Sequence, residues 1–106
     1  MLSENSFNEK VKELLLEIPI GRVTTYGIIA EKCGMKSSAR MVGYILNSLK
    51  NQTKYPCHRV VNRFGELSGK NHFQGEELMQ ELLESEGIEV TDNKVKLSNY
   101  LWNPLD

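Results

Sequence analysis

Residues 24–49 read TTYGIIAEKCGMKSSARMVGYILNSL, and this stretch predicts two short helices separated by a tight turn. Thr24 or Thr25 can cap a first helix that runs from Tyr26 to about Cys33, since threonine is a favoured helix N-cap. Gly34-Met35-Lys36 forms the turn, and Ser37-Ser38 caps a second helix that reaches about Leu49. This is the helix-turn-helix pattern, whose second helix usually contacts DNA, although proteins that never touch DNA also contain it.

The second helix has one face of small side chains. Ala39 and Gly43 lie four residues apart with Asn47 continuing the row, whereas the side chains expected to pack inward are Met41, Ile45 and Leu49. A mid-helix glycine costs about 1 kcal/mol of stability against alanine, and a close approach of this face to another surface would account for that cost. That surface could be another helix of the core or DNA. The neighbouring Arg40 favours DNA.

The flanking sequence predicts further short elements and no repeat or linker. A helix is expected over about Asn5 to Glu17, with an apolar stripe at helical spacing formed by Phe7, Val11, Leu14, Leu15 and Ile18. Val60-Val61, followed by Leu67, indicates either a hairpin around Phe64-Gly65 or a strand that ends in a loop.

The C-terminal part predicts a helix and a hairpin. The helix is expected over Gly75 to Glu86, closed by Gly87. Residues 88–97, with a turn at Asp92-Asn93, predict a terminal hairpin that resembles a wing. The tail Tyr100-Leu101-Trp102-Asn103-Pro104 is expected to pack its aromatic rings onto the body.

Length and composition are those of one soluble globular domain, residues 1–106. The chain is 40% hydrophobic and 25% charged, and no apolar run approaches the roughly 20 residues of a membrane span. The first residues do not resemble a signal peptide, so a cytoplasmic location is expected. The two cysteines, Cys33 and Cys57, should both remain thiols in a reducing compartment.

The charges are segregated along the chain although the formal net charge is only −1. Between Lys32 and Gly65 there is no acid, and the seven basic residues are Lys32, Lys36, Arg40, Lys50, Lys54, Arg59 and Arg63. Such a distribution favours a basic face that binds a polyanion. A solvated basic face without a partner fits the same pattern.

Cys57 and His58 are adjacent within Pro56-Cys57-His58-Arg59-Val60. A thiol becomes a nucleophile as the thiolate, which needs a base, and the imidazole needs a third group to orient it. The alternatives are an inert buried cysteine beside a surface histidine, or a zinc site that includes Cys33 and His72. The spacing of the Cys and His residues matches no zinc motif, so neither a metal nor a cofactor is expected. A papain-like peptidase would need a larger body.

Four motifs together resemble the C-terminal domain of the O6-alkylguanine-DNA alkyltransferases and the shorter alkyltransferase-like proteins. They span about residues 7–104 in total, and they are Ile18-Pro19-x-Gly21-x-Val23-x-x-Tyr26-Gly27, Ala39-Arg40-x-Val42-Gly43, Pro56-Cys57-His58-Arg59-Val60 and Leu82-Leu83-x-x-Glu86-Gly87. The resemblance implies an α+β fold, a small winged-helix-like domain of the alkyltransferase C-terminal type.

The resemblance also implies roles for individual residues. Cys57 would accept the alkyl group irreversibly, His58 would deprotonate the thiol through a water, and Glu86 would hold the imidazole in its useful tautomer. Tyr26 would help to rotate the damaged nucleotide out of the duplex, and Arg40 would fill the gap left in the base stack. The residues expected to contact DNA are Tyr26, Ser38, Ala39, Arg40, Gly43, Lys54, Arg59 and Arg63. The residues expected to form the alkylguanine pocket are Tyr26, Pro56, Val60, Ser68 and Gly69.

Three departures from the enzymes point to the alkyltransferase-like proteins. The sequence shows no N-terminal domain, the loop Ser68–Gly75 lacks a Tyr-x-Gly-Gly segment, and Leu49 replaces an asparagine that links the DNA-reading helix to the active-site turn. Alkyltransferase-like proteins bind and flip O6-alkylguanine without transfer, pass the lesion to nucleotide excision repair, and carry Trp or Ala in place of Cys57.

Three hypotheses follow. The first is a compact alkyltransferase that uses Cys57, the second is a lesion-binding sensor, and the third is a plain winged-helix regulator with an inert cysteine. The expected partners are double-stranded DNA with O6-alkylguanine and, for a sensor, excision-repair proteins. The chain is expected to be a monomer with no membrane contact, located with the DNA in the cytoplasm or, in a eukaryote, in the nucleus.

Overall fold

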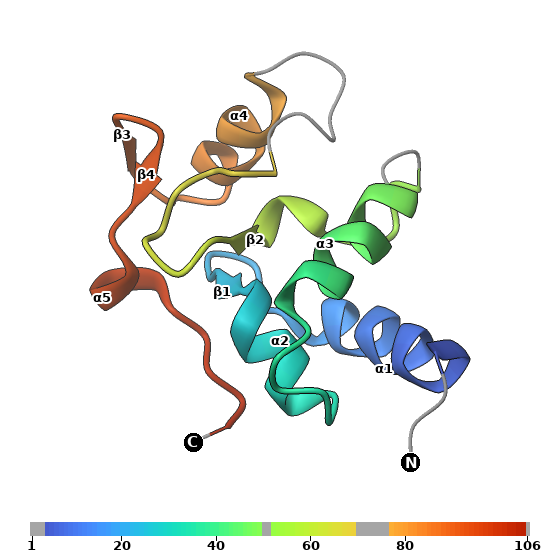
Figure 1. The fold of residues 1–106 in the computed structure, drawn as a ribbon. Helices are drawn as coiled ribbons and strands as arrows, with labels where there is room; N and C mark the ends of the chain where they lie inside the picture. Colours follow the sequence, from blue (N-terminus) through green and yellow to red (C-terminus); the bar gives the residue numbers. More distant parts are fainter. Residues whose placement is uncertain (1–3, 50–51, 70–76, 106) are drawn as a thin grey trace.

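The computed structural model describes residues 4–49, 52–69 and 77–105 (Figure 1). Its elements in chain order are α1 (Glu4–Glu17), β1 (Thr24–Thr25), α2 (Tyr26–Lys32), α3 (Ala39–Ser48), the 3-10 turn η1 (Cys57–Arg59), β2 (Val60–Val61), α4 (Leu78–Ser85), β3 (Val90–Thr91), β4 (Lys94–Val95) and α5 (Leu97–Tyr100). This is the expected α+β organisation, with α1, α2 and α3 grouped on one side and α4 with the hairpin on the other.

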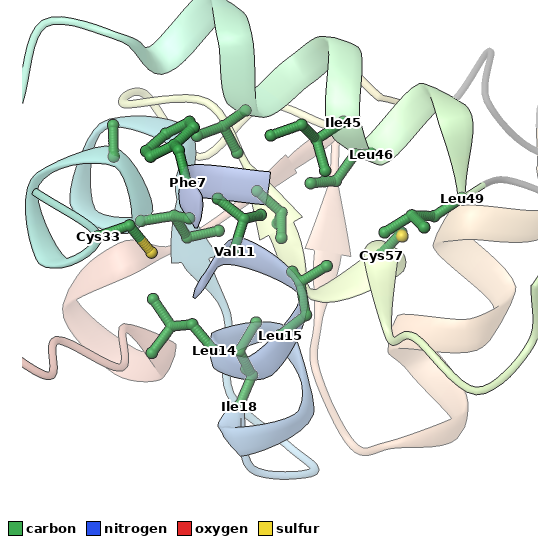
Figure 2. Close-up of a cluster of buried hydrophobic side chains, with 14 residues drawn as sticks. Phe7, Val11, Leu14, Leu15, Ile18, Cys33, Ile45, Leu46, Leu49 and Cys57 are labelled. Atoms are coloured by element: carbon green, nitrogen blue, oxygen red, sulfur yellow. The ribbon is translucent and has the colours of Figure 1, made fainter. Parts of the chain in front are cut away.

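Helix α1 supplies the apolar stripe that was expected from its spacing. Phe7, Val11 and Leu15 are at most 1% exposed, and Leu14 and Ile18 are also buried. These side chains form a cluster with residues of α2 and α3 and with Cys57 (Figure 2). Because Cys57 belongs to this cluster, packing of the helices fixes the backbone turn that carries it.

The helix-turn-helix is formed by α2 and α3. Of the two candidate caps, Thr25 is the one used, since its hydroxyl accepts a hydrogen bond from the Ile28 N–H at 3.2 Å. Ser38 stands at the N-cap of α3 without a side-chain capping bond. Among the expected inward residues of α3, Ile45 and Leu49 are buried while Met41 is only partly so; the fully packed positions also include Val42 and Leu46.

A small parallel sheet lies at the centre. Thr24 pairs with Val60 and Thr25 with Val61, so Val60-Val61 is a strand that ends in a loop and not one arm of a hairpin. The C-terminal tail extends the sheet, because the Val23 N–H donates to the Tyr100 carbonyl and the Trp102 N–H donates to the Val23 carbonyl. Successive strand residues face opposite ways, and accordingly Val60 packs with α1 and Val61 with α4.

The turn after β2 is hydrogen-bonded to the terminal hairpin. The Asn62 side chain accepts hydrogen bonds from the N–H groups of Phe64 and Glu66. The expected hairpin is confirmed: β3 and β4 are antiparallel around Asp92 and Asn93, both at positive φ. The Val95 N–H donates to the Gly65 carbonyl at 2.8 Å, which joins the hairpin to the turn.

Helix α4 ends as expected at Gly87, which has a φ of +85°. Its expected start at Gly75 lies outside the described residues, and the helix begins at Leu78. The aromatic tail packs as expected, with Trp102 against the α1–α3 cluster and Tyr100 against the α4 cluster. Across the described ranges, none of the helices combines the length and apolar character needed to cross a membrane.

Gly65 should be intolerant of substitution. Its φ is +83°, and a Cβ there would overlap the Val95 carbonyl oxygen. We expect Gly65→Ala to lower the free energy of unfolding by roughly 3 kcal/mol, measured by urea denaturation.

Gly43→Ala is the matched control, since a Cβ at Gly43 meets nothing within 4 Å in the middle of α3. This variant should be more stable than the parent by up to about 1 kcal/mol. Equal effects of the two substitutions would contradict the close contact between Gly65 and the hairpin.

Candidate DNA-binding and alkyl-acceptor site

The Pro56–Val60 segment is a single turn of 3-10 helix that leads into β2. The Cys57 N–H donates to the Tyr55 carbonyl at 2.8 Å, and the Arg59 N–H donates to the Pro56 carbonyl at 3.0 Å. Pairing of Val60 with Thr24 anchors the end of the turn. Cys57 is 7% exposed and lies at one end of the cluster shown in Figure 2.

The carboxylate of Glu86, just after α4, holds this turn from the other side. Its Oε2 lies 2.6 Å from the His58 Nε2, and Arg59 donates from Nε to Oε1 at 2.9 Å and from Nη2 to Oε2 at 2.8 Å. The Gly21 N–H donates to Oε1 as well, at 3.3 Å. The resemblance to the alkyltransferases implied the pairing of His58 with Glu86, and the structure brings these two residues together.

The arginine of this network was missed by sequence reasoning. Arg59 was expected at DNA phosphates, but its guanidinium binds Glu86 in a bidentate manner and donates from Nη1 to the Ile18 carbonyl at 2.9 Å. Its side chain is 13% exposed. Arg59 therefore ties the Cys57 turn to the segments that follow α1 and α4, so its guanidinium is occupied within the protein.

The network fixes the protonation of both partners. Burial opposes ionisation of Glu86, but hydrogen bonds from Arg59, His58 and the Gly21 N–H outweigh it and lower its pKa to about 2. Burial lowers the pKa of His58 despite the pull of Glu86, so the imidazole is neutral at pH 7. Since the ionised carboxylate accepts from Nε2–H, the free lone pair is on Nδ1.

The surroundings of Cys57 favour the protonated thiol over the thiolate. Burial raises its pKa to about 11, an effect that a backbone hydrogen bond opposes only in part. The cysteine is therefore buried, as its inert interpretation required, and it directly precedes His58, whose imidazole is held by Glu86. Cys33 is also a free, buried thiol, and burial raises its pKa too.

A groove of about 600 Å³ runs along the exposed face of α3. It is lined by Tyr26, Ala39, Arg40, Gly43, Tyr44, Asn47 and Ser68. The row of small side chains expected from the sequence thus faces open space, not another helix. Tyr26 lies at the end of the groove near Cys57, and burial raises the pKa of its hydroxyl, which also forms a hydrogen bond with Ser68.

Three other residues expected to contact DNA are not among those that line the groove. Ser38 is half-buried at the start of α3, whereas Lys54 and Arg63 are exposed. The Lys54 ammonium lies 5.0 Å from the centre of the Tyr55 ring, and the Arg63 guanidinium lies 4.7 Å from that of Phe64. Lys50 falls outside the described residues. Tyr44 and Asn47 line the groove but were not among the expected contacts, although their spacing from Arg40 and Gly43 would have revealed them.

The expected alkylguanine pocket is only partly in place. Tyr26 and Ser68 line the groove, but Pro56 is half-buried, Gly69 is buried, and neither is among the lining residues. Val60 is 0% exposed within the cluster, so it supports the turn from inside the core. The remainder of the Ser68–Gly75 loop, from residue 70 onward, lies outside the described residues.

Leu49 connects α3 to the active-site turn by packing. It is 2% exposed and belongs to the same cluster as Cys57, so the link that this side chain makes is an apolar one (Figure 2). In the parts of the chain that the structure describes, no group of three or more His, Cys, Asp or Glu side chains could hold a metal ion. His72, one of the residues considered for zinc, lies outside the described residues.

The family model described as "6-O-methylguanine DNA methyltransferase, DNA binding domain" matches residues 6–88. The chain belongs to this family. The matched segment contains α1, the helix-turn-helix, the Cys57 turn and Glu86, so the family assignment rests on the same residues as the site.

Two relatives match almost the whole chain. Alkyltransferase-like protein 1 of Schizosaccharomyces pombe is 39% identical over 105 residues, covering 94% of this chain and 97% of its own. The DNA base-flipping protein of Escherichia coli is 38% identical over 106 residues, covering 97% and 79%. The family also includes the methylated-DNA–protein-cysteine methyltransferase of Candida glabrata, 36% identical over 93 residues and covering 88% and 44%.

The fold agrees with these relationships. The crystal structure of S. pombe Atl1 in complex with damaged DNA containing O6-carboxymethylguanine superimposes with a TM-score of 0.86 at 38% identity, covering 98% of this chain and 100% of that chain. The expected alkyltransferase-type fold is confirmed.

Acid should weaken the fold through Glu86. A carboxyl whose pKa is lowered on folding stabilises the protein fully above its ordinary pKa near 4.5, and that contribution disappears as the pH falls towards 2. At pH 7, Glu86→Gln should lower the free energy of unfolding by about 2 kcal/mol, because Arg59 loses its charged partner.

The gap between parent and Glu86→Gln should then narrow as the pH falls from 4.5 to 2, measured by urea denaturation at each pH. Glu84→Gln is the matched control, since Glu84 is an exposed carboxylate at the same end of α4. A gap that is constant with pH would mean that Glu86 is not held ionised by its partners.

Proposed function

We propose that this protein binds duplex DNA through the α3 groove, rotates an O6-alkylguanine out of the base stack, and accepts its alkyl group on Cys57. The observation that carries the proposal is the hydrogen bond between His58 and Glu86 in the turn that also carries Cys57, together with the groove that Tyr26 and Arg40 line. Chemistry at guanine O6 requires the base to leave the stack, which costs a few kcal/mol. Alkylation weakens pairing and so lowers that cost at the damaged base.

The charge of the groove suits DNA. Arg40, Lys54 and Arg63 are all exposed, as are Lys32 and Lys36 near the helix-turn-helix. The acid-free stretch from Lys32 to Gly65 supplies these cations. Contacts of small side chains in the minor groove distinguish sequences poorly, which suits a protein that must recognise damage in any context.

The bonds, electrons and proton of the proposed transfer step are all accounted for. His58 Nδ1 takes the thiol proton through a water, and the sulfur attacks the alkyl carbon while the carbon–O6 bond breaks. A new S–C bond forms, the electron pair passes into the guanine ring, and the proton ends on the restored guanine. Because the thiol pKa is about 11, the reaction depends on this base.

A lesion sensor without transfer is the second candidate. The extensive similarity to alkyltransferase-like protein 1 and to the DNA base-flipping protein favours it, as does the raised pKa of the buried Cys57 thiol. A sensor would hold the extruded base and recruit nucleotide excision repair proteins. In either case, we propose that the protein acts as a monomer where the DNA is, in the cytoplasm or in the nucleus of a eukaryote.

Transfer is tested by intact mass after incubation with a duplex containing O6-methylguanine. The parent should gain about 14 Da, the mass of one CH₂ added to the thiol, once per molecule. Cys57→Ala should gain nothing, whereas Cys33→Ala, which removes the other buried thiol, should react as the parent does. Tight binding to the lesion with no mass gain in the parent would leave the sensor as the function.

Recognition is tested separately through Arg40. Arg40→Ala should weaken binding to the lesion-containing duplex by about 2 kcal/mol, roughly thirtyfold in Kd, because nothing fills the gap in the base stack. Lys94→Ala is the control, since it removes an exposed cation on the hairpin, away from the groove. Equal affinities of the parent and Arg40→Ala would exclude the role of Arg40.

A further inference from the structure

The exposed face of α3 consists of two rows of different size. Ala39, Gly43 and Asn47 follow one another four residues apart, and Arg40 and Tyr44 form a parallel row one position on. The first row contains the small side chains that allow close approach. The larger side chains of the second row project beyond the first row, so a DNA duplex that packs against the first row must also contact the second row.

Within residues 4–49, 52–69 and 77–105, Tyr44 takes no part in the buried core. Its side chain is 65% exposed, it lines the groove, and it belongs to neither buried cluster. A Cβ at the neighbouring Gly43 would meet nothing within 4 Å, so the space around this part of α3 is open. A large, exposed aromatic ring on an otherwise small-featured face is typical of a contact residue.

Resting on the proposed function, we propose that Tyr44 is a specificity-determining residue that reads the base pair beside the lesion from the minor groove. Residues four apart on a helix are about 6 Å apart along its axis, close to the rise of two base-pair steps. With Arg40 in the gap of the flipped nucleotide, Tyr44 contacts the duplex one or two steps away.

The chemistry of the tyrosine side chain sets the preference. In the minor groove, A·T pairs present only the acceptors N3 and O2, whereas G·C pairs add the guanine 2-amino group. The Tyr44 hydroxyl donates to such an acceptor, and the 2-amino group obstructs the ring. The affinity of the protein for DNA therefore depends on whether A·T or G·C stands at this one place.

The test uses duplexes in which a single A·T pair, at each of the three steps on either side of O6-methylguanine, is replaced by G·C. Binding of the parent should weaken about three- to tenfold at one or two adjacent positions on one side, the range of one neutral hydrogen bond. An inosine·cytosine pair lacks the 2-amino group, so it should behave as A·T there.

Two variants separate the ring from the hydroxyl. Tyr44→Gly should abolish the dependence on the flanking pair, and Tyr44→Phe should reduce the preference for A·T while it keeps the obstruction by the 2-amino group. Leu16→Ala is the control, because Leu16 is 56% exposed on α1, away from the groove. The assignment would be overturned if the affinity of the parent did not depend on the flanking base pair, or if Tyr44→Gly kept the dependence seen in the parent.

The same series on undamaged duplexes keeps the two proposals distinct. A parent that binds damaged and undamaged DNA equally refutes lesion recognition, yet the profile of undamaged sequences still shows whether Tyr44 reads a base pair. Conversely, lesion binding that is lost in Arg40→Ala but insensitive to Tyr44→Gly supports the proposed function and refutes the role of Tyr44.

Discussion

The carboxylate of Glu86 is the constraint on which the rest of the site depends. It receives Arg59 on both oxygens, His58 on one and the Gly21 N–H on the other, and Arg59 in turn reaches the Ile18 carbonyl. The segments after α1, before β2 and after α4 therefore converge on one ionised group. An uncompensated carboxylate there would be costly, so the three segments hold one another in place.

This convergence connects local structure to chemistry. Parallel pairing of β1 with β2 places the Cys57 turn next to the start of α2, where Tyr26 faces the groove. Leu49 joins the end of α3 to the same cluster by packing. The helix that lines the groove and the turn that carries the thiol are thus parts of one core, and neither can move far without the other.

The sequence predicted what depends on periodicity and on short motifs. The helix-turn-helix and the hairpin around Asp92-Asn93 follow from such signals, whereas the pairing of His58 with Glu86 was implied only by the family resemblance. The role of Arg59 could not be predicted, because a basic residue in an acid-free stretch has the same pattern whether it faces phosphate or a carboxylate 27 residues away. The parallel pairing of Val60-Val61 also depends on a distant segment that no local pattern identifies.

The burial of Cys57 has a consequence for the life of the protein in a cell. With a pKa of about 11, only about one thiol in ten thousand is ionised at pH 7, and peroxides and soluble electrophiles react mainly with thiolates. The thiol that we propose as the alkyl acceptor is thereby protected from oxidation while the protein is not bound to DNA. The core that buries Cys57 therefore determines how long the thiol remains unoxidised, as well as how readily it reacts.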